Sequence, residues 1–292
     1  MTTTTATAPA TPLHESGQSL GGRAAARIRR LILPTIVALI YAFLYLPALV
    51  IVMYSFSKSA VMSWPPSLFT LHWYHSALGD ADLTTGLKNS AIVAVSSVTI
   101  ALLLGVPAAF GFDRFGFWGK SYFERLLVMP FLMPGIVSGI TLLTVFIDLS
   151  IPLSLRTVVI GHASMLIAVF VIQVQVGLAR WDKQLEAAAM DLGANEVRTF
   201  LYVLLPNLSK TILGACLLGI TVSLDEIART FFLTGTDNTL PMVIWSKLHQ
   251  QLTPQVNAVA SIILGVSLAA MILWSRVTRL PSWQERPTAS SE

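Results

Sequence analysis

The sequence is poor in charge and nearly free of cysteine. Charged residues make up 12% of the 292 residues, whereas about 25% is usual in soluble globular domains. A shortage of this size argues against a soluble protein. The single cysteine, Cys216, excludes a disulfide within the chain, and we expect it to be a small buried packing residue.

Sequence motifs of several enzyme classes are absent as well. The chain contains neither G-x-S-x-G nor H-E-x-x-H, and no phosphate-binding G-x-x-x-x-G-K-[ST]. These absences argue against an intramembrane hydrolase, and they mean that any ATP would be handled by another chain. We therefore predict that the chain is not an enzyme and has no catalytic residue, no metal site and no cofactor.

The chain is basic, with 19 Lys and Arg against 15 Asp and Glu. A nucleic-acid-binding protein would gather its basic residues in a patch with interleaved aromatic side chains. Here they are dispersed between apolar segments. We therefore exclude nucleic acid as a partner.

What the sequence has in abundance is long apolar runs. A helix needs roughly 20 apolar residues to cross the hydrocarbon layer of a bilayer. Strands of a membrane barrel would be about half as long and would alternate in polarity, so these runs favour helices. We predict an all-α membrane protein, surrounded by lipid, with six transmembrane helices at residues 31–57, 89–112, 126–147, 157–179, 208–224 and 256–275.

The distribution of Lys and Arg predicts the orientation. With six spans, 14 of the 19 basic residues fall on the side that holds both termini. Short loops rich in Lys and Arg stay cytoplasmic, so both termini should be cytoplasmic. The first run is too long for the core of a signal peptide and should be an uncleaved anchor. We expect a disordered cytoplasmic tail at residues 1–30, a transmembrane domain at 31–280 and a short cytoplasmic tail at 281–292.

The predicted cytoplasmic loop at about residues 180–210 is unusually long, because about 2–8 residues suffice to join two helices. Asp182 and Asn195 can each cap a helix N-terminus, and Gly193 stands where a left-handed residue would end the first helix. Pro206 is expected to end the amphipathic stretch before the fifth span. The loop therefore predicts two short helices with a sharp bend, the first of which offers a small apolar face to another protein.

Three groups of residues in this loop have a characteristic spacing: Glu186-Ala187-Ala188, Gly193 and Val203-Leu204-Leu205-Pro206. Together they resemble the EAA loop of ABC importer permeases, with Val203 in place of the usual Ile. The spacing from Gly193 to Pro206 fits that pattern. The stretch from Ala188 to Gly193 is one residue longer than the pattern, and aligning Ala187-Ala188-Ala189 with the Ala run would place Glu186 one position early.

Three further stretches extend the resemblance over most of the chain after the tail. Residues 104–120 (LGVPAAFGFDRFGFWGK) and 129–143 (MPFLMPGIVSGITLL) are similar to core helices of these permeases. Residues 223–268 look most like the PotC-like branch, which is associated with spermidine and putrescine uptake. The resemblance implies a permease for polyamines or a similar small solute.

The resemblance also implies partners and a mechanism. The partners would be a cytoplasmic ABC ATPase dimer, an extracytoplasmic substrate-binding protein and a second permease subunit, either a copy of this chain or a different one. The first loop helix, at about residues 184–192, would be the coupling helix that passes the motion of the ATPase to the spans. The residues assigned to ATPase coupling are Glu186, Ala187, Ala188, Asp191, Gly193, Leu205 and Pro206.

Two carboxylates, Asp225 and Glu226, follow the fifth span on the expected extracytoplasmic side. Acidic groups at membrane depth are costly and usually functional, and the PotC-like branch has an acidic pair here. They are therefore candidates for a substrate pathway that attracts a polycation. The alternative is a structural ion pair, because Arg229 is placed at i+4 from Asp225.

Other polar and small residues are expected to serve packing. His162, early in the fourth span, fits a hydrogen-bonded packing role better than a proton relay. Small residues recur at every fourth position at Ala101, Gly105 and Ala109 and at Ala215 and Gly219, which favours close helix approach.

The main alternative function is an ATP-independent secondary transporter or channel. Such proteins often contain inverted repeats or charges buried in the middle of a span. The sequence shows neither, and uptake that requires ATP would separate the two functions.

Overall fold

The structure is a computed structural model, and it describes residues 20–60, 63–66, 69–250 and 253–277. Within these residues the regular elements are helices, apart from one isolated bridge between Ser57 and Phe69. The prediction of an all-helical protein is therefore confirmed. The chain divides into two compact units, Met1–Met53 and Tyr54–Glu292.

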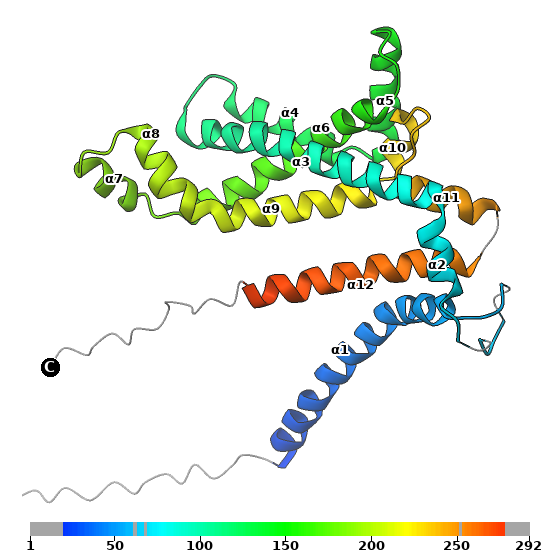
Figure 1. The fold of residues 1–292 in the computed structure, drawn as a ribbon. Helices are drawn as coiled ribbons and strands as arrows, with labels where there is room; N and C mark the ends of the chain where they lie inside the picture. The colour runs from blue at the N-terminus through cyan, green and yellow to red at the C-terminus, as the bar shows by residue number, and fades with distance from the viewer. Residues whose placement is uncertain (1–19, 61–62, 67–68, 251–252, 278–292) are drawn as a thin grey trace, which may run out of the picture. The chain divides into compact units, whose positions relative to one another are not determined.

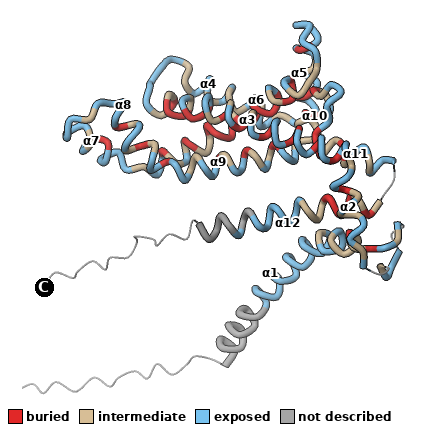
Figure 2. Tube along the Cα trace, viewed as in Figure 1, coloured by how far each residue is buried: buried red, intermediate tan, exposed pale blue. Residues whose placement is uncertain are grey.

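The first unit contains most of one long helix, α1 (Leu20–Ser55). This helix begins within the segment 1–30 for which we predicted a disordered tail, and residues 1–19 lie outside the described residues. Its part Ile32–Ser55 is long and apolar enough to cross a membrane. Most side chains along this part are exposed (Figure 2), which leaves the apolar surface free to contact lipid or another subunit.

Three long helices form the core of the second unit. α3 (Ala81–Arg114), α6 (Leu155–Ala179) and α9 (Leu205–Asp225) lie side by side (Figure 1) and share one buried apolar cluster. α6 is the most deeply buried of the three, and its Leu166 and Phe170 have no exposed surface. A helix that is apolar on all sides fits this central position, because it meets either protein or lipid all round.

Small residues allow these helices to approach closely. Ala101 of α3 and Ala215 of α9 are buried. A Cβ atom added at Gly105 would lie 2.7 Å from Cβ of Phe170 and 3.0 Å from the backbone oxygen of Ile167. The small residues therefore lie at helix interfaces, as their spacing predicted.

The third apolar run is divided into two helices. α4 (Lys120–Leu132) and α5 (Gly135–Asp148) meet at an angle of 104°. The prediction of one continuous span over residues 126–147 therefore needs correction. The cause is local: Pro134 has no N–H to donate to the carbonyl of Pro130, and its own backbone is extended.

Fewer spans are found than the six predicted. The described residues contain four helices that could cross a membrane, or five if the bent pair α4–α5 is one span. The sixth predicted span corresponds to α12 (Pro254–Val277), a helix of 24 residues whose part Pro254–Ala269 is apolar.

The second unit also contains the short helices α2 (His72–Gly79), α7 (Gln184–Asp191), α8 (Glu196–Thr199), α10 (Ala228–Leu233) and α11 (Leu240–Gln250), and a π-helical turn, η1 (Phe200–Leu204). Helices α2, α3, α11 and α12 contribute to a small apolar cluster of Ala77, Leu83, Leu240, Val243 and Val259.

The carboxylate of Asp80 forms contacts with three helices. Asp80 accepts hydrogen bonds from the backbone N–H groups of Asp82 and Leu83 and so caps α3. It also pairs with Lys247 of α11 at 2.7 Å and accepts from the Gln255 side chain of α12 at 3.1 Å. Burial by itself raises the pKa of Asp80, but the hydrogen bonds and the charge of Lys247 outweigh it, so the pKa is lowered.

The contact between α3 and α6 provides a test of the fold. Gly105→Ala would place a methyl group against Phe170 and Ile167, whereas Gly111→Ala on the same helix would meet no atom within 4 Å. We expect Gly105→Ala to lower the midpoint of thermal unfolding in detergent, because overpacking costs about 1–3 kcal/mol. Gly111→Ala should leave the midpoint unchanged or slightly raised, since Ala favours helix over Gly. Equal midpoints for the two variants would contradict the close packing.

Candidate functional site

The first helix of the predicted cytoplasmic loop begins and ends at residues that favour a helix start and a helix end. α7 (Gln184–Asp191) begins next to Asp182, whose side chain accepts a hydrogen bond from the N–H of Gln184 at 2.9 Å. Gly193 follows the helix with φ of +88°, a left-handed backbone that favours glycine. Both features confirm the sequence prediction, and Figure 1 shows α7 and α8 at one end of the α3–α6–α9 core.

α7 exposes most of the residues assigned to coupling. Ala187, Ala188 and Asp191 are exposed. The apolar side chains of Leu185 and Leu192 are 49% and 90% exposed. A short helix with small and apolar side chains on its surface is suited to contact with another protein.

Glu186 is the exception, because it is buried and 4% exposed. Its carboxylate forms an ion pair with Arg114, in the last turn of α3. Beside this pair, the ammonium of Lys183 lies 3.9 Å from the carboxylate of Asp113. The loop is thus joined to α3 by charged groups, a connection that the sequence analysis did not find.

The second loop helix runs directly into α9. Asn195 caps α8 (Glu196–Thr199), as predicted, and a π-helical turn, η1 (Phe200–Leu204), continues into α9. The prediction that Pro206 ends the amphipathic stretch therefore needs correction. Pro206 lies in the first turn of α9, directly after the π-helical turn, and Leu205 before it is half-buried.

At the other end of α9, the two candidate carboxylates differ in their surroundings. Asp225 is exposed and forms no ion pair with a described residue. Oε2 of Glu226 lies 3.2 Å from Nη1 of Arg229. The structural ion pair considered for Asp225 is therefore made by Glu226 instead. The reason is that α9 ends at Asp225 and the backbone is extended at Glu226, so the helical i+4 spacing does not apply.

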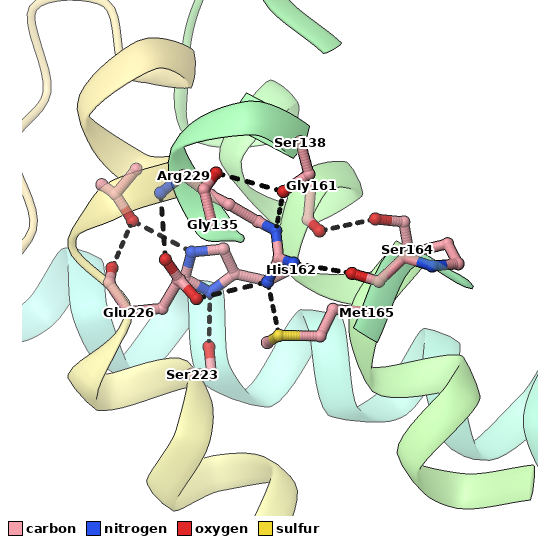
Figure 3. A network of polar contacts seen from close by, with 11 residues as sticks. Gly135, Ser138, Gly161, His162, Ser164, Met165, Ser223, Glu226 and Arg229 are labelled. Atoms are coloured by element: carbon pink, nitrogen blue, oxygen red, sulfur yellow. Dashed lines mark hydrogen bonds and ion pairs between the residues drawn. The ribbon is translucent and has the colours of Figure 1, made fainter. Parts of the chain in front are cut away.

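Arg229 is the centre of a buried polar network (Figure 3). Its side chain is 2% exposed, yet each of its nitrogens has a partner. Nε donates to Oγ of Ser138 at 2.6 Å, and Nη2 donates to the backbone oxygen of Pro130 at 2.7 Å. Nη1 contacts both Glu226 and the sulfur of Met165. Arg229 therefore binds the very carbonyl that the break between α4 and α5 leaves without a helical partner.

His162 of α6 extends the polar contacts in this region. Its Nδ1 lies 2.8 Å from Oγ of Ser223 in α9, and its Nε2 lies 2.9 Å from Oγ1 of Thr230 in α10. The imidazole is 1% exposed. His162 is thus hydrogen-bonded within the packing, as expected, and it links α6 to α9 and α10.

Cys216 is half-buried in α9, where it packs against the main apolar cluster. Among the residues that the structure describes, no group of three or more His, Cys, Asp or Glu side chains is arranged to hold a metal ion.

Comparison with known proteins identifies the family. Residues 101–280 match the family described as "Binding-protein-dependent transport system inner membrane component". The chain is a permease of a binding-protein-dependent ABC importer. The resemblance that the EAA-like loop indicated is therefore confirmed.

Curated relatives support the same assignment. The permease is 32% identical to the putrescine transport system permease protein PotI of Escherichia coli K12 over 249 residues, which covers 82% of this chain and 88% of the relative. It is 31% identical to the spermidine/putrescine transport system permease protein PotC of Escherichia coli K12 over 254 residues, which covers 86% of this chain and 96% of the relative.

A solved structure supports the fold. A bacterial ABC transporter involved in the import of the acidic polysaccharide alginate contains a chain that matches with a TM-score of 0.65 and 17% identity. The match covers 93% of the permease and 100% of that chain. At this identity the likeness speaks for the fold alone.

Family membership decides several predictions. The permease is a multi-pass inner-membrane protein and a non-catalytic subunit. A binding-protein-dependent ABC system implies an ATPase and a periplasmic binding protein as partners. The alternative of an ATP-independent transporter or channel is thereby excluded.

The network around Arg229 predicts a large effect on stability. Arg229→Met would take away the charged partner of the Glu226 carboxylate, which would keep only the backbone N–H of residue 229 as a donor, and would leave the Pro130 carbonyl without its donor. Removing one partner of a buried ion pair costs about 3–5 kcal/mol. We expect much less folded permease in the membrane, measured by size-exclusion chromatography of a fluorescently tagged chain. Arg156→Met, at an exposed arginine of α6, is the matched control and should be neutral. Adding Glu226→Gln to Arg229→Met should recover part of the loss, and no recovery would contradict the ion pair.

Proposed function

We propose that the permease imports polyamines such as putrescine and spermidine. The observation that carries the proposal is its 32% and 31% identity to two curated polyamine permeases over more than four-fifths of the chain. Both of these relatives are named for putrescine transport. A polyamine is a small flexible polycation, so carboxylates on its route would stabilise it in a medium where water is scarce.

The proposed topology has six crossings, with both termini in the cytoplasm. Four candidate spans and the bent pair α4–α5 supply five of them, and α12, a helix of 24 residues, would supply the sixth. The excess of Lys and Arg on the side of the termini supports this orientation. On this assignment residues 31–280 form the transmembrane domain, between tails at 1–30 and 281–292.

The proposed coupling helix is α7. Its exposed residues Ala187, Ala188 and Asp191 would contact the ATPase dimer, and the bend at Gly193 would set its direction. Closure of the ATPase on binding ATP would then displace α7 and switch the access of the pathway. A second permease subunit, identical or different, would complete the pathway and meet the other half of the ATPase dimer.

Asp225 and Glu226 are the proposed pathway residues for the cation. Asp225 supports this role more directly, because it is exposed and its charge is not neutralised by a described residue. Glu226 shares its charge with Arg229 and would attract a cation less strongly.

Uptake measurements test the pathway. In vesicles that contain the complete transporter, with its ATPase and binding protein, we expect ATP-dependent uptake of radiolabelled putrescine. Asp225→Asn should reduce this uptake about tenfold, because a hydrogen bond to a charged group contributes about 1.5 kcal/mol. Asp237→Asn removes another exposed carboxylate and should have no effect. Undiminished uptake by Asp225→Asn would remove this residue from the pathway, and a wild-type transporter that ignores polyamines would refute the cargo.

The bend after α7 provides a test of coupling. Gly193→Val would force a β-branched residue into a left-handed backbone at a cost of about 1–2 kcal/mol, whereas Gly193→Asn tolerates that conformation. A Cβ atom added at this position would meet no atom within 4 Å, so the two variants differ mainly in how well they tolerate the left-handed backbone. We expect Gly193→Val to lose co-purification with the ATPase and to lose uptake, while Gly193→Asn keeps both. Normal assembly and uptake by Gly193→Val would contradict the coupling role of α7.

A further inference from the structure

The end of α3 and the start of α7 carry complementary charges. Asp113 and Arg114 are neighbours at the C-terminal end of α3, and Lys183 and Glu186 lie about one turn apart at the N-terminal end of α7. Arg114 binds Glu186, and Lys183 lies 3.9 Å from Asp113. Each helix thus contributes one acid and one base to the contact.

The two ion pairs differ in burial. The side chain of Lys183 is 72% exposed, so water screens its attraction to Asp113 and the pair contributes little. The side chain of Glu186 is 5% exposed, and its Oε1 has no hydrogen-bond partner among the described residues. Arg114 therefore provides the one described counter-charge for a buried carboxylate, which makes this pair the stronger constraint.

Arg114 belongs to a helix that is itself firmly held. It lies in the last turn of α3, where the helix dipole favours a cation. α3 shares its buried apolar cluster with α6 and α9. α7 has only eight residues and packs against α8 and η1. The ion pair therefore connects a short surface helix directly to the membrane core.

We propose that Arg114 is a positioning residue for the coupling helix: its ion pair with Glu186 fixes α7 to α3, so that a displacement of α7 moves α3 directly. The inference rests on the proposed function, in which the ATPase docks on α7. Because Ala187, Ala188 and Leu192 are exposed while Glu186 is buried, the pair can be removed without changing the docking surface. Docking of the ATPase on α7 and transmission of its displacement to α3 are then separable properties.

Charge reversal tests this separation. Arg114→Glu, Glu186→Arg and the double variant are prepared in the complete transporter and reconstituted with the binding protein. We expect each single variant to co-purify with the ATPase as the wild type does, but to transport at least tenfold less putrescine per ATP hydrolysed. The double variant restores a pair of opposite charges and should recover at least half of the wild-type ratio. Single variants with a wild-type ratio, or a double variant no better than the single ones, would overturn the inference.

Lys183→Gln is the matched control, because it removes only the exposed pair of the same contact. The amount of putrescine that this variant transports per ATP hydrolysed should stay within twofold of the wild-type value. A loss as large as that of Arg114→Glu would mean that the net charge of the contact matters rather than the pair between the half-exposed Arg114 and the buried Glu186, and would also overturn the inference.

A second pair of variants covers the case in which charge reversal prevents folding. Arg114→Cys and Glu186→Cys are combined with Cys216→Ser, which removes the natural cysteine of the chain. We expect this variant to be poorly coupled until a short bismaleimide joins the two cysteines, and the crosslink should then restore transport per ATP at least fivefold. A crosslinked protein that stays uncoupled would count against the inference. Failure of the wild-type permease to bind the ATPase through α7 would instead refute the proposed function.

Discussion

The buried guanidinium of Arg229 is the interaction on which the arrangement of the second unit depends. The break between α4 and α5 frees a backbone carbonyl, and such a group costs free energy when it is removed from water without a hydrogen-bond partner. Arg229 reaches across from α10 and donates to that carbonyl at Pro130 and to Ser138 on the far side of the break. Its own charge is balanced by Glu226. One side chain therefore permits a bend of 104° that would otherwise expose unsatisfied polar groups.

This network also decides what the acidic pair after α9 can do. Glu226 is committed to Arg229, which leaves Asp225 as the carboxylate that faces outward. His162 fixes Ser223, just before this pair, and Thr230, just after it, from the side of α6. A carboxylate that is held on both sides by buried hydrogen bonds keeps its position without a partner of its own. That is the condition for a site that receives a cation and releases it again, and it agrees with the pathway role proposed for Asp225.

Structure was predicted correctly from the sequence where the rule used depends on a few neighbouring residues. Run length and the absence of charge predicted α1, α3, α6 and α9 as spans, and single residues such as Gly193 and Asn195 predicted the helix ends of the loop. Prediction was wrong where a rule assumed a continuous helix. The bend at Pro134 divided the third run, and the turn at Glu226 gave Arg229 a different partner from the one that i+4 spacing suggested.

Rules of local spacing could not predict contacts between segments that are far apart in the sequence. Glu186 and Arg114 are separated by 72 positions, and no local spacing relates them. The same holds for Arg229 and Pro130, which are 99 positions apart. The family pattern marked the loop around Glu186 as important, but only the ion pair with Arg114 and the burial along α7 show that this glutamate is buried while Ala187 and Ala188 are exposed.

The close packing of the core between these two charged contacts suits the proposed transmission of motion from α7. α7 lies at one end of α3, α6 and α9, and α10, which carries Arg229, lies toward the other end (Figure 1). Between the ends, Gly105 meets α6 at a distance that leaves no room for a methyl group, so α3 and α6 cannot slide past each other freely. A loosely packed core would absorb a small displacement at α7. In the proposed mechanism a closely packed core would move as a body and pass the displacement to the bend at Pro134 and to the carboxylates after α9. The small residues in the spans are therefore as necessary to the proposed mechanism as the charges at either end.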